Sequence, residues 1–321
     1  MLIAVGAITR RRPKMFGDLL DSFARMRRPD GARLIFVFAE NDTEFGVTDQ
    51  IEAFRAQVPE DVRLELEPRP GIPMGRNKVL DMALEAGADF LTFVDDDEVV
   101  TEDWLVELIA GVEARALDLA GAPVQLIAPE GAMTGWNEAV LKHLQYRSDR
   151  RNRDRRRMVA DGTEGEMNIY TNNWCLRLAT QRRLGVRFDE ALQYTGGSDT
   201  RFSLDMKAAG GRIGWVPDAV VEEPTPQKRL TLTYHYKRAR DQATNAVILN
   251  RKDPVRSVLQ GVMRIVDAIL LVIAFPVTGK YGIAKAAHKL GIAMGRFRGV
   301  FGATSSHYDP DASKFHTEKA K

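Results

Sequence analysis

The chain of 321 residues has very little cysteine and no long apolar run. Its single cysteine, Cys175, excludes an internal disulfide and is typical of a protein from a reducing compartment. The first residues lack the basic region and the long apolar stretch of a signal peptide, so we expect a protein that is not exported. The most apolar stretch, residues 268–275, lies between Asp267 and Pro276 and is shorter than the roughly 20 residues that a membrane-spanning helix needs.

The formal net charge is only +2, but the charges are unevenly distributed. Residues 225–321 carry 17 Lys and Arg against 6 Asp and Glu, whereas the rest of the chain carries 29 against 38. An acidic body repels nucleic acid, and the arginine-dense residues 147–157 lack the interleaved aromatic side chains that stack on bases, so we expect no nucleic-acid partner. The basic C-terminal part is suited to an anionic membrane surface.

The first hundred residues alternate short apolar runs with stretches of helical periodicity. The predicted strands are residues 3–8, 34–39, 62–66 and 90–94. With a helix over residues 76–86, this alternation predicts an α/β fold with a mostly parallel sheet flanked by helices. Ligands bind such sheets beyond the carboxyl ends of the strands, where Thr9, Asp42 and the acidic residues after Val94 would emerge.

Three consecutive aspartates, Asp95, Asp96 and Asp97, follow the last of these strands. Carboxylates this close together repel one another unless a positive charge lies between them. Mg²⁺ and Mn²⁺ prefer oxygen ligands and share their coordination with substrate phosphates, so a metal site for a phosphate-bearing substrate is one interpretation. A solvated acidic turn is the other, and these residues alone do not decide between the two.

The later part of the chain is predicted to contain a polar loop and a helical region. Residues 147–165 are predicted as a loop because their like charges disfavour packing, with a flap near a phosphorylated substrate as the functional alternative. We expect a catalytic domain over residues 1–240, a helical, membrane-associating region over 241–304 and a disordered tail over 305–321.

A helix after Gly282 shows the clearest amphipathic pattern. Its apolar positions, 3.6 residues per turn apart, are Ile283, Ala287, Leu290, Met294, Phe297 and Phe301. Lys285, Lys289 and Arg296 lie on the opposite side. Such a helix either lies in the membrane interface or packs on the core of its own protein, and the basic charge of this region favours the membrane.

Six short motifs occur in a characteristic order along residues 1–240. They are Thr9-Arg10-Arg11-Arg12-Pro13, Glu40-Asn41-Asp42, Gly75-Arg76-Asn77, Asp95-Asp96-Asp97-Glu98, Thr171-Asn172-Asn173 and Thr195-Gly196-Gly197-Ser198-Asp199-Thr200. Together they resemble the motifs of family 2 inverting glycosyltransferases, and within that family those of bacterial exopolysaccharide enzymes of the succinoglycan type. The resemblance implies a GT-A fold and the transfer of a sugar from a nucleotide-diphosphate donor to a glycan acceptor linked to a lipid diphosphate.

The resemblance implies roles in donor binding. Thr9 and Asp42 would hold the nucleotide base, and a carboxylate that accepts the imide N–H of uracil favours a UDP-sugar. Arg76 and Asn77 would lie beside the base and the ribose. The structural alternatives are a turn residue for Asp42 and an exposed side chain in the first turn of a helix for Arg76.

The family pattern also implies different roles for the three aspartates. Asp95 would lie on the ribose side and Asp97 would bind the metal, Mg²⁺ or Mn²⁺, with Asp95 as a second ligand. Because successive strand residues point to opposite faces, Asp96 would turn away or meet the backbone, and we count it with Asp95 in the donor site. The metal would neutralise the charge that grows on the leaving diphosphate.

Asp199 occupies the place of the general base, which deprotonates the attacking acceptor hydroxyl. Its structural alternative is an acidic residue that stabilises the dipole of a helix. Gly196 and Gly197 would let the backbone approach the sugar closely. Ser198 stands where the family usually has Glu, so the acceptor contacts of that Glu do not carry over.

Two further groups complete the predicted site. Asn172, Asn173 and Trp174 are expected to shape the pocket that selects the sugar. Glu222 is expected where many relatives place a His or an acidic residue beside the metal, although a solvated strand end explains it equally.

We therefore predict a metal-dependent inverting glycosyltransferase that acts at the cytoplasmic face of the membrane in exopolysaccharide synthesis. A sugar nucleotidyltransferase shares the α/β plan, but residues 6–10 match poorly the glycine-rich phosphate loop that it would need. A non-catalytic nucleotide-binding or glycan-binding protein docked on the membrane also fits the motif spacing. Release of diphosphate from a nucleoside triphosphate would favour the nucleotidyltransferase.

Overall fold

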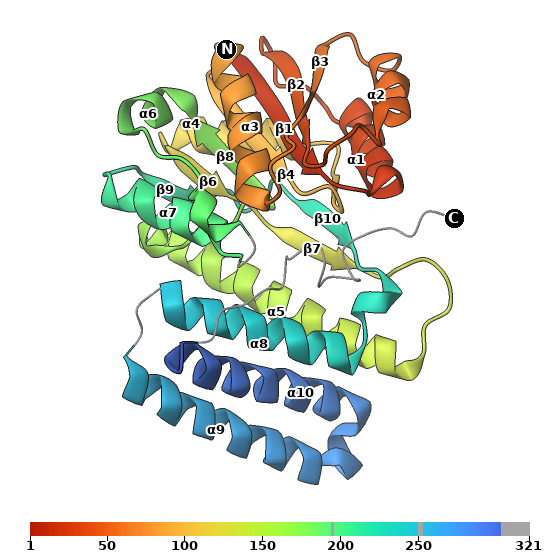
Figure 1. The fold of residues 1–321 in the computed structure, drawn as a ribbon, viewed down its shortest axis with the longest axis vertical. Helices are drawn as coiled ribbons and strands as arrows, with labels where there is room; N and C mark the ends of the chain where they lie inside the picture. Colours follow the sequence, from red (N-terminus) through yellow and green to blue (C-terminus); the bar gives the residue numbers. More distant parts are fainter. Residues whose placement is uncertain (194–195, 250–252, 303–321) are drawn as a thin grey trace.

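The computed structural model describes residues 1–193, 196–249 and 253–302 (Figure 1). A sheet flanked by helices forms the upper part in Figure 1, and long helices form the lower part. Thr195 of the last motif and the predicted disordered tail over 305–321 lie outside the described residues.

The main sheet has seven strands in the order β3-β2-β1-β4-β8-β6-β9. They are β1 (Leu2–Thr9), β2 (Arg33–Glu40), β3 (Asp61–Leu66), β4 (Phe90–Val94), β6 (Leu119–Gly121), β8 (Asn173–Arg177) and β9 (Ile213–Trp215). Only β8 runs antiparallel to its neighbours, so the predicted mostly parallel sheet is confirmed. The four predicted strands match β1 to β4 to within one residue at each end.

Helices cover both faces of this sheet because its strands are buried on both sides. One face carries α1 (Pro13–Arg25), α2 (Thr48–Arg55) and α4 (Trp104–Ala114). The other carries α3 (Ile72–Glu85), α6 (Leu178–Leu184) and α7 (Ser198–Ala208). Along β1, Ile3 and Val5 pack on the first face and Ala4 on the second, as the two-residue period requires.

A three-stranded sheet connects the two parts of the molecule. It consists of β5 (Val99–Val100), β10 (Val221–Pro224) and β7 (Val124–Ile127), in the order β5-β10-β7. Because β5 begins two residues after Asp97, its pairing with β10 brings Glu223 to the acidic end of the main sheet.

The predicted loop over residues 147–165 is wrong, because most of it belongs to the long helix α5 (Gly135–Ala160). Thr134 and Asn137 form a capping box at its start. The arginines are good helix formers and find partners beyond the helix, since the guanidinium of Arg155 lies 4.0 Å from the ring centroid of Trp215 and Arg156 lies 3.0 Å from Asp218.

Three helices complete the lower part: α8 (Leu232–Leu249), α9 (Pro254–Ile273) and α10 (Phe275–Val300). Helix α8 runs without a break across residue 240, where we expected the catalytic domain to end. Helix α10 lies between α8 and α9 (Figure 1). A Cβ at Gly291, Gly295 or Gly299 would collide with atoms of α8, so these glycines allow the close approach of the two helices.

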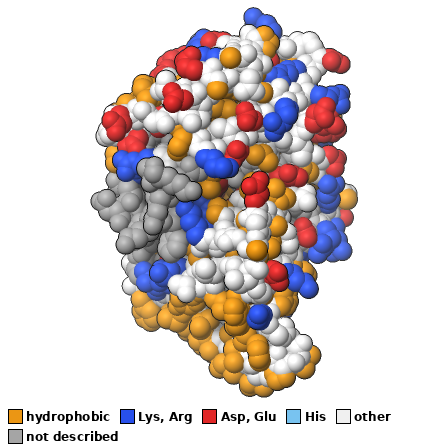
Figure 2. Space-filling model, turned by 90° about the vertical axis from the view of Figure 1, so that its right-hand side faces the viewer, with side chains coloured by type: hydrophobic (Ala, Val, Ile, Leu, Met, Phe, Trp, Pro, Cys, Tyr) orange, Lys and Arg blue, Asp and Glu red, His pale blue; other side chains and the backbone are white. Residues whose placement is uncertain are grey.

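The exposed apolar surface lies mainly on α9, not on α10. Phe297 of α10 packs on Gly261 of α9, so part of the apolar face predicted for α10 is covered. The exposed apolar side chains of α9 include Val255, Leu259, Val262, Met263, Val266, Ile269, Leu270, Val272 and Ile273. Figure 2 shows them as an apolar lower end of the molecule. Among the described helices, none combines the length and the hydropathy needed to cross a membrane.

Candidate active site

The site lies at the carboxyl end of β1 and β4, where Asp96 is held by two residues of the first motif. The Thr9 hydroxyl donates a hydrogen bond of 2.8 Å to Asp96 Oδ2. Arg12 Nη1 donates to Asp96 Oδ1 at 2.6 Å. Asp96 is buried and turned towards the end of β1, so the two motifs meet there. We expected Asp96 to turn away or to meet the backbone, but its carboxylate accepts hydrogen bonds from two side chains.

Asp97 is paired with arginines from distant parts of the chain. Its Oδ2 lies 2.8 Å from Arg229 Nη1 and 3.5 Å from Arg12 Nη1. Arg229 comes from the short 3₁₀ turn Gln227–Arg229 and also lies 3.6 Å from Glu223. Although burial opposes ionisation, Arg229 and Arg12 hold the pKa of Asp97 below its usual value.

Asp95 connects the acidic residues to α3 and α7. Burial, together with the charges of Asp97, Asp96 and Asp199, raises the pKa of Asp95 to about 7 against the opposing effect of Arg76. Arg76 Nη2 lies 3.7 Å from Asp95 Oδ1, and Arg76 Nη1 donates to the Ser198 hydroxyl at 3.0 Å. The buried guanidinium therefore joins the end of β4 to the residue that precedes Asp199.

Asp199 lies in the first turn of α7 and is half-buried. Gly196 and Gly197, with φ of 77° and 88°, form the turn that leads into this helix, a conformation that favours glycine. Asp199 Oδ1 accepts a hydrogen bond of 2.6 Å from the Thr200 amide. The charge of Asp199 contributes to the raised pKa of Asp95, so the Asp199 carboxylate lies near the acidic residues. It also lies at a helix N-terminus, which stabilises a negative charge.

Asp42 lies beyond the end of β2, away from the three aspartates. Arg11 Nη2 donates to Asp42 Oδ1 at 3.1 Å, and Arg10 Nε lies 4.0 Å from Oδ2. Although burial opposes ionisation, the bonds from Arg11 and the Thr43 amide lower the pKa of Asp42. Asp42 is an ionised hydrogen-bond acceptor on the same edge of the sheet as Thr9.

The structure buries three predicted contact residues in the framework of the site. Asn77 accepts from the Phe188 amide and donates to its carbonyl, both at 3.0 Å. Asn173 binds Trp104 Nε1 at 2.9 Å and the carbonyls of two neighbouring segments. Trp174 is 1% exposed and packs on aromatic rings.

Direct substrate contact, which we expected for Asn77, Asn173 and Trp174, is not compatible with this placement. The Asn77 amide is already bonded to Phe188. Asn173 and Trp174 are part of the core because β8 is a central strand that is covered on both faces. Asn172 is half-buried just before β8, and the neighbouring Thr171 hydroxyl is buried without a partner among the described residues.

Four charged residues of the site were not assigned a role from the sequence: Arg12, Glu98, Glu223 and Arg229. Glu98 Oε2 accepts from the Asp95 amide at 3.2 Å, and burial raises its pKa well above the usual value. Glu223, not Glu222, lies beside Arg229, because alternation along β10 buries Glu223. The three consecutive arginines after Thr9 were the available signal for Arg12, whereas no local pattern marks Arg229.

The metal site expected at Asp97 and Asp95 does not fit the arrangement described here. Carboxylate oxygens suit Mg²⁺ or Mn²⁺, but Asp97 already has the guanidiniums of Arg229 and Arg12 as counter-charges. Within residues 1–193, 196–249 and 253–302, no group of three or more His, Cys, Asp or Glu is placed to hold a metal ion.

The solved structures that share this fold include the following two. The mannosyltransferase PcManGT from Pyrobaculum calidifontis, in complex with GDP-Man and Mn²⁺, matches 91% of this chain and 74% of its own, with a TM-score of 0.52 and 16% identity. S. aureus TarS 1–349 matches 93% and 91%, with a TM-score of 0.50 and 19% identity. At these identities the likeness shows the fold alone, and it is the GT-A fold of glycosyltransferases, as expected.

Sequence comparison decides the family. The model described as "Glycosyltransferase like family 2" matches residues 3–244. The succinoglycan biosynthesis protein ExoM of Rhizobium meliloti (strain 1021) is 33% identical over 241 residues, which cover 74% of this chain and 71% of that protein. The chain belongs to glycosyltransferase family 2, and the predicted enzyme class is confirmed.

Proposed function

We propose that the protein transfers a sugar, with inversion, from a nucleotide-diphosphate donor to a glycan acceptor in exopolysaccharide synthesis. The observation that carries this proposal is the bridge of Arg76 between Asp95 and Ser198, because it unites the donor-side aspartates and Asp199 in one site. The 33% identity to ExoM, a succinoglycan biosynthesis protein, supports a role in exopolysaccharide synthesis. Solved relatives in fold include TarS with UDP-GlcNAc and PcManGT with GDP-Man, which supports a nucleotide-sugar donor.

The donor would lie along the carboxyl edge of the sheet, from β2 to β4. Asp42 is ionised and would accept the imide N–H of uracil, which favours a UDP-sugar. Thr9 and Asp96, which are joined by a hydrogen bond, would lie beneath the donor between its base and its diphosphate. Asp95 would contact the ribose. Arg12 and Arg229 bring positive charge to the place where the diphosphate leaves.

Asp199 is the proposed general base. Its carboxylate would take the proton from the acceptor hydroxyl while that oxygen forms a bond to the anomeric carbon. The bond from that carbon to the nucleotide diphosphate breaks on the opposite face, and the electron pair leaves with the diphosphate. Ser198 would hold Arg76 in place for this step rather than contact the acceptor as the usual Glu does.

As they stand, Asp97 and Asp95 do not fit Mg²⁺ or Mn²⁺, because Asp97 is paired with Arg229 and Arg12. Binding of Mg²⁺ or Mn²⁺ by Asp97 and Asp95 would require Arg229 to release Asp97. An ion bound there would supply Lewis-acid stabilisation of the leaving diphosphate. Arg12 and Arg229 provide part of that positive charge from the chain itself.

Incubation of the pure protein with UDP-sugars and GDP-sugars, with and without Mn²⁺, tests the function. We expect slow hydrolysis of one donor, and faster turnover when a lipid-diphosphate-linked glycan is added. The absence of hydrolysis and transfer with every donor would favour a binding protein. Diphosphate released from a nucleoside triphosphate would favour a nucleotidyltransferase.

The apolar surface of α9 is the proposed membrane contact, on the cytoplasmic face of the membrane. Its exposed side chains form one continuous apolar end of the molecule, and Lys and Arg side chains border it (Figure 2). The excess of basic residues in this part of the chain selects an anionic lipid surface as the partner. A lipid-linked acceptor would then be within reach of an enzyme held at its own membrane.

A further inference from the structure

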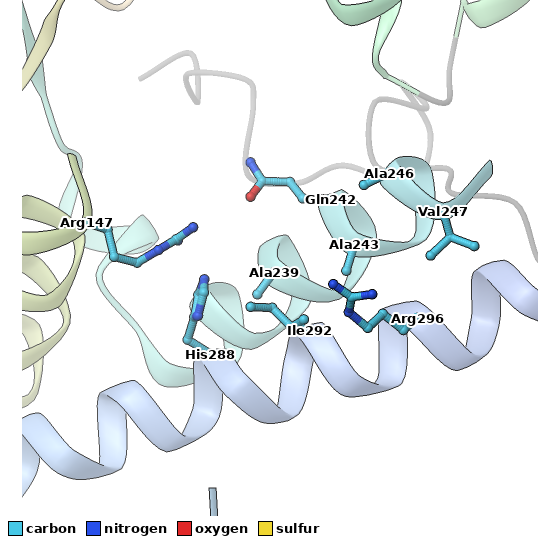
Figure 3. A pocket seen from close by; sticks show the side chains of 9 residues that line it. All are labelled: Arg147, Ala239, Gln242, Ala243, Ala246, Val247, His288, Ile292 and Arg296. Atoms are coloured by element: carbon cyan, nitrogen blue, oxygen red, sulfur yellow. The ribbon is translucent and has the colours of Figure 1, made fainter. Parts of the chain in front are cut away.

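A cavity of about 210 Å³ lies between α5, α8 and α10, and no residue of the acidic site lines it (Figure 3). Its polar lining consists of Arg147, Gln242, His288 and Arg296, and alanines of α8 form much of the rest. In Figure 3 the side chains of Arg147 and His288 point towards one another, and Arg296 rises from α10 towards α8.

The positive charge of this cavity is not compensated within the described part of the chain. The lining contains no carboxylate. Arg147 and Arg296 are both half-buried, and Arg296 Nε and Nη1 are fully buried without a hydrogen-bond partner among the described residues. Partly desolvated charge without a partner is costly, which is why such cations normally have one.

The electrostatics of the lining agree with its geometry. Burial and the charges of Arg151 and Arg238 lower the pKa of Arg147 to about 10. Burial and Arg264 lower the pKa of Arg296. The carboxylates of α8 and α9 already have partners, because Asp241 pairs with Arg240 and Asp267 with Lys289. Positive charge therefore accumulates here without an anion.

A cation is a poor candidate for this place. The rings of His143, His235 and His288 lie 5.0–5.3 Å apart beside the cavity. They form no metal-binding group in the described structure, and the surrounding arginines would repel a metal ion. Burial lowers the pKa of His288 to about 2, so its imidazole is neutral and offers an N–H rather than a charge.

We propose that this cavity binds a phosphate or diphosphate group. Two guanidinium forks, an amide and a neutral imidazole supply donors for tetrahedral oxygens, and guanidinium binds phosphate in a bidentate manner. The volume has room for several water molecules, each taking about 30 Å³ in the liquid, so a hydrated phosphate fits.

Arg238 of α8 adds further positive charge near this cavity, because it lowers the pKa of Arg147. If the proposed function holds, the phosphate of a membrane-linked acceptor is one source of this anion, and free phosphate is the other.

Calorimetric titration of the full-length protein with inorganic phosphate and with pyrophosphate tests the site. The double variant Arg147→Gln, Arg296→Gln removes both forks and is expected to weaken binding about tenfold or more. Arg256→Gln, an exposed position on α9, is the matched control and should bind like the wild type. Equal affinity in the double variant and the wild type would overturn the proposal.

Two further measurements separate misfolding and ligand source. Because the double variant removes two half-buried charges, its melting temperature should be unchanged or raised. Phosphate should raise the melting temperature of the wild type only. Arg296→Lys keeps the charge but loses the fork, so an intermediate affinity is expected. Flotation with phosphatidic acid vesicles and with neutral phosphatidylcholine vesicles distinguishes a lipid headgroup from free phosphate. If the double variant floats less than the wild type with the acidic vesicles only, the anion is a lipid headgroup. If its flotation is unchanged, the anion is free phosphate.

These results do not depend on catalysis. Phosphate binding is measured without a sugar donor, so it can fail while transfer succeeds, or succeed while transfer fails. Wild-type protein that binds neither phosphate nor pyrophosphate would also refute the site.

Discussion

The two ends of the molecule treat charge in opposite ways. At the carboxyl end of the sheet, buried carboxylates are matched by arginines, as in the pair of Asp97 with Arg229. In the helical part, Arg147 and Arg296 line a cavity that contains no carboxylate, and α9 exposes apolar side chains. The aspartates of the sheet already have arginine counter-charges, which a bound substrate can replace. The arginines of the cavity have no such counter-charge, so binding of an external anion would stabilise them.

The strongest test of the matched end is Asp199→Asn. Loss of a general base should lower the transfer rate about 10²–10⁴-fold, because the acceptor hydroxyl keeps its proton, while donor binding stays nearly the same. Asp205→Asn on the same helix, where Asp205 pairs with Arg201, is the control and should retain activity. Turnover rates in the presence of a saturating donor decide the matter, and undiminished transfer would remove Asp199 from the role of base.

The exposed end is tested by Leu259→Glu with Met263→Glu. Each side chain contributes about 1.5–3 kcal/mol when it is fully buried, so losing both should weaken binding to anionic vesicles more than tenfold. Phe45→Glu changes an exposed apolar side chain outside this surface and should not affect sedimentation with vesicles. Equal sedimentation of all three proteins would mean that α9 does not contact lipid.

The pairing of arginine with the aspartates is tested by Arg229→Gln. Without this guanidinium Asp97 and Glu223 lose a counter-charge, so the affinity for Mn²⁺ should rise about tenfold. The free Mn²⁺ signal in electron paramagnetic resonance reports binding without any need for turnover. Lys228→Gln makes the same change in net charge at an exposed neighbour, and equal effects of the two variants would contradict a specific pairing.

The smallest effect concerns the histidines between α5, α8 and α10. Burial lowers the pKa values of His143, His235 and His288 to about 4, 3 and 2. The charged groups that act on them are the cations Arg147, Arg238, Arg264, Lys285 and Lys289. In the unfolded chain these histidines have their ordinary pKa of about 6.5, so below that pH the unfolded state binds more protons than the folded state. The free energy of unfolding is therefore highest above pH 6.5 and decreases as the pH falls below it.

Denaturant unfolding at pH 7.5 and pH 5.5 measures this loss. Each histidine should contribute about 1 kcal/mol of it, and His288→Gln should reduce the difference between the two pH values by that amount. A wild-type stability that does not change over this interval would show that the histidines are not buried as described.

The sheet was predictable and much of the detail of the site was not. Strands β1 to β4 follow from local alternation and apolar runs, and the order of the parallel strands was enough to bring Thr9 to the aspartates. Trp174 was misassigned because an aromatic residue beside a motif looks the same in sequence whether it faces the core or a substrate. The helix α5 was missed because its arginines find partners, such as Trp215 and Asp218, that lie far away in the chain.

The sequence by itself determined the α/β fold and the set of motifs, because both depend on residue types at short, regular spacings. Only the tertiary structure decided that Arg229 neutralises Asp97, 132 residues away, and that α9 rather than α10 carries most of the exposed apolar surface. It also decided that Arg147 and Arg296 face one cavity. These outcomes depend on how whole elements pack, since a charge or an apolar face does not encode which distant surface it will meet.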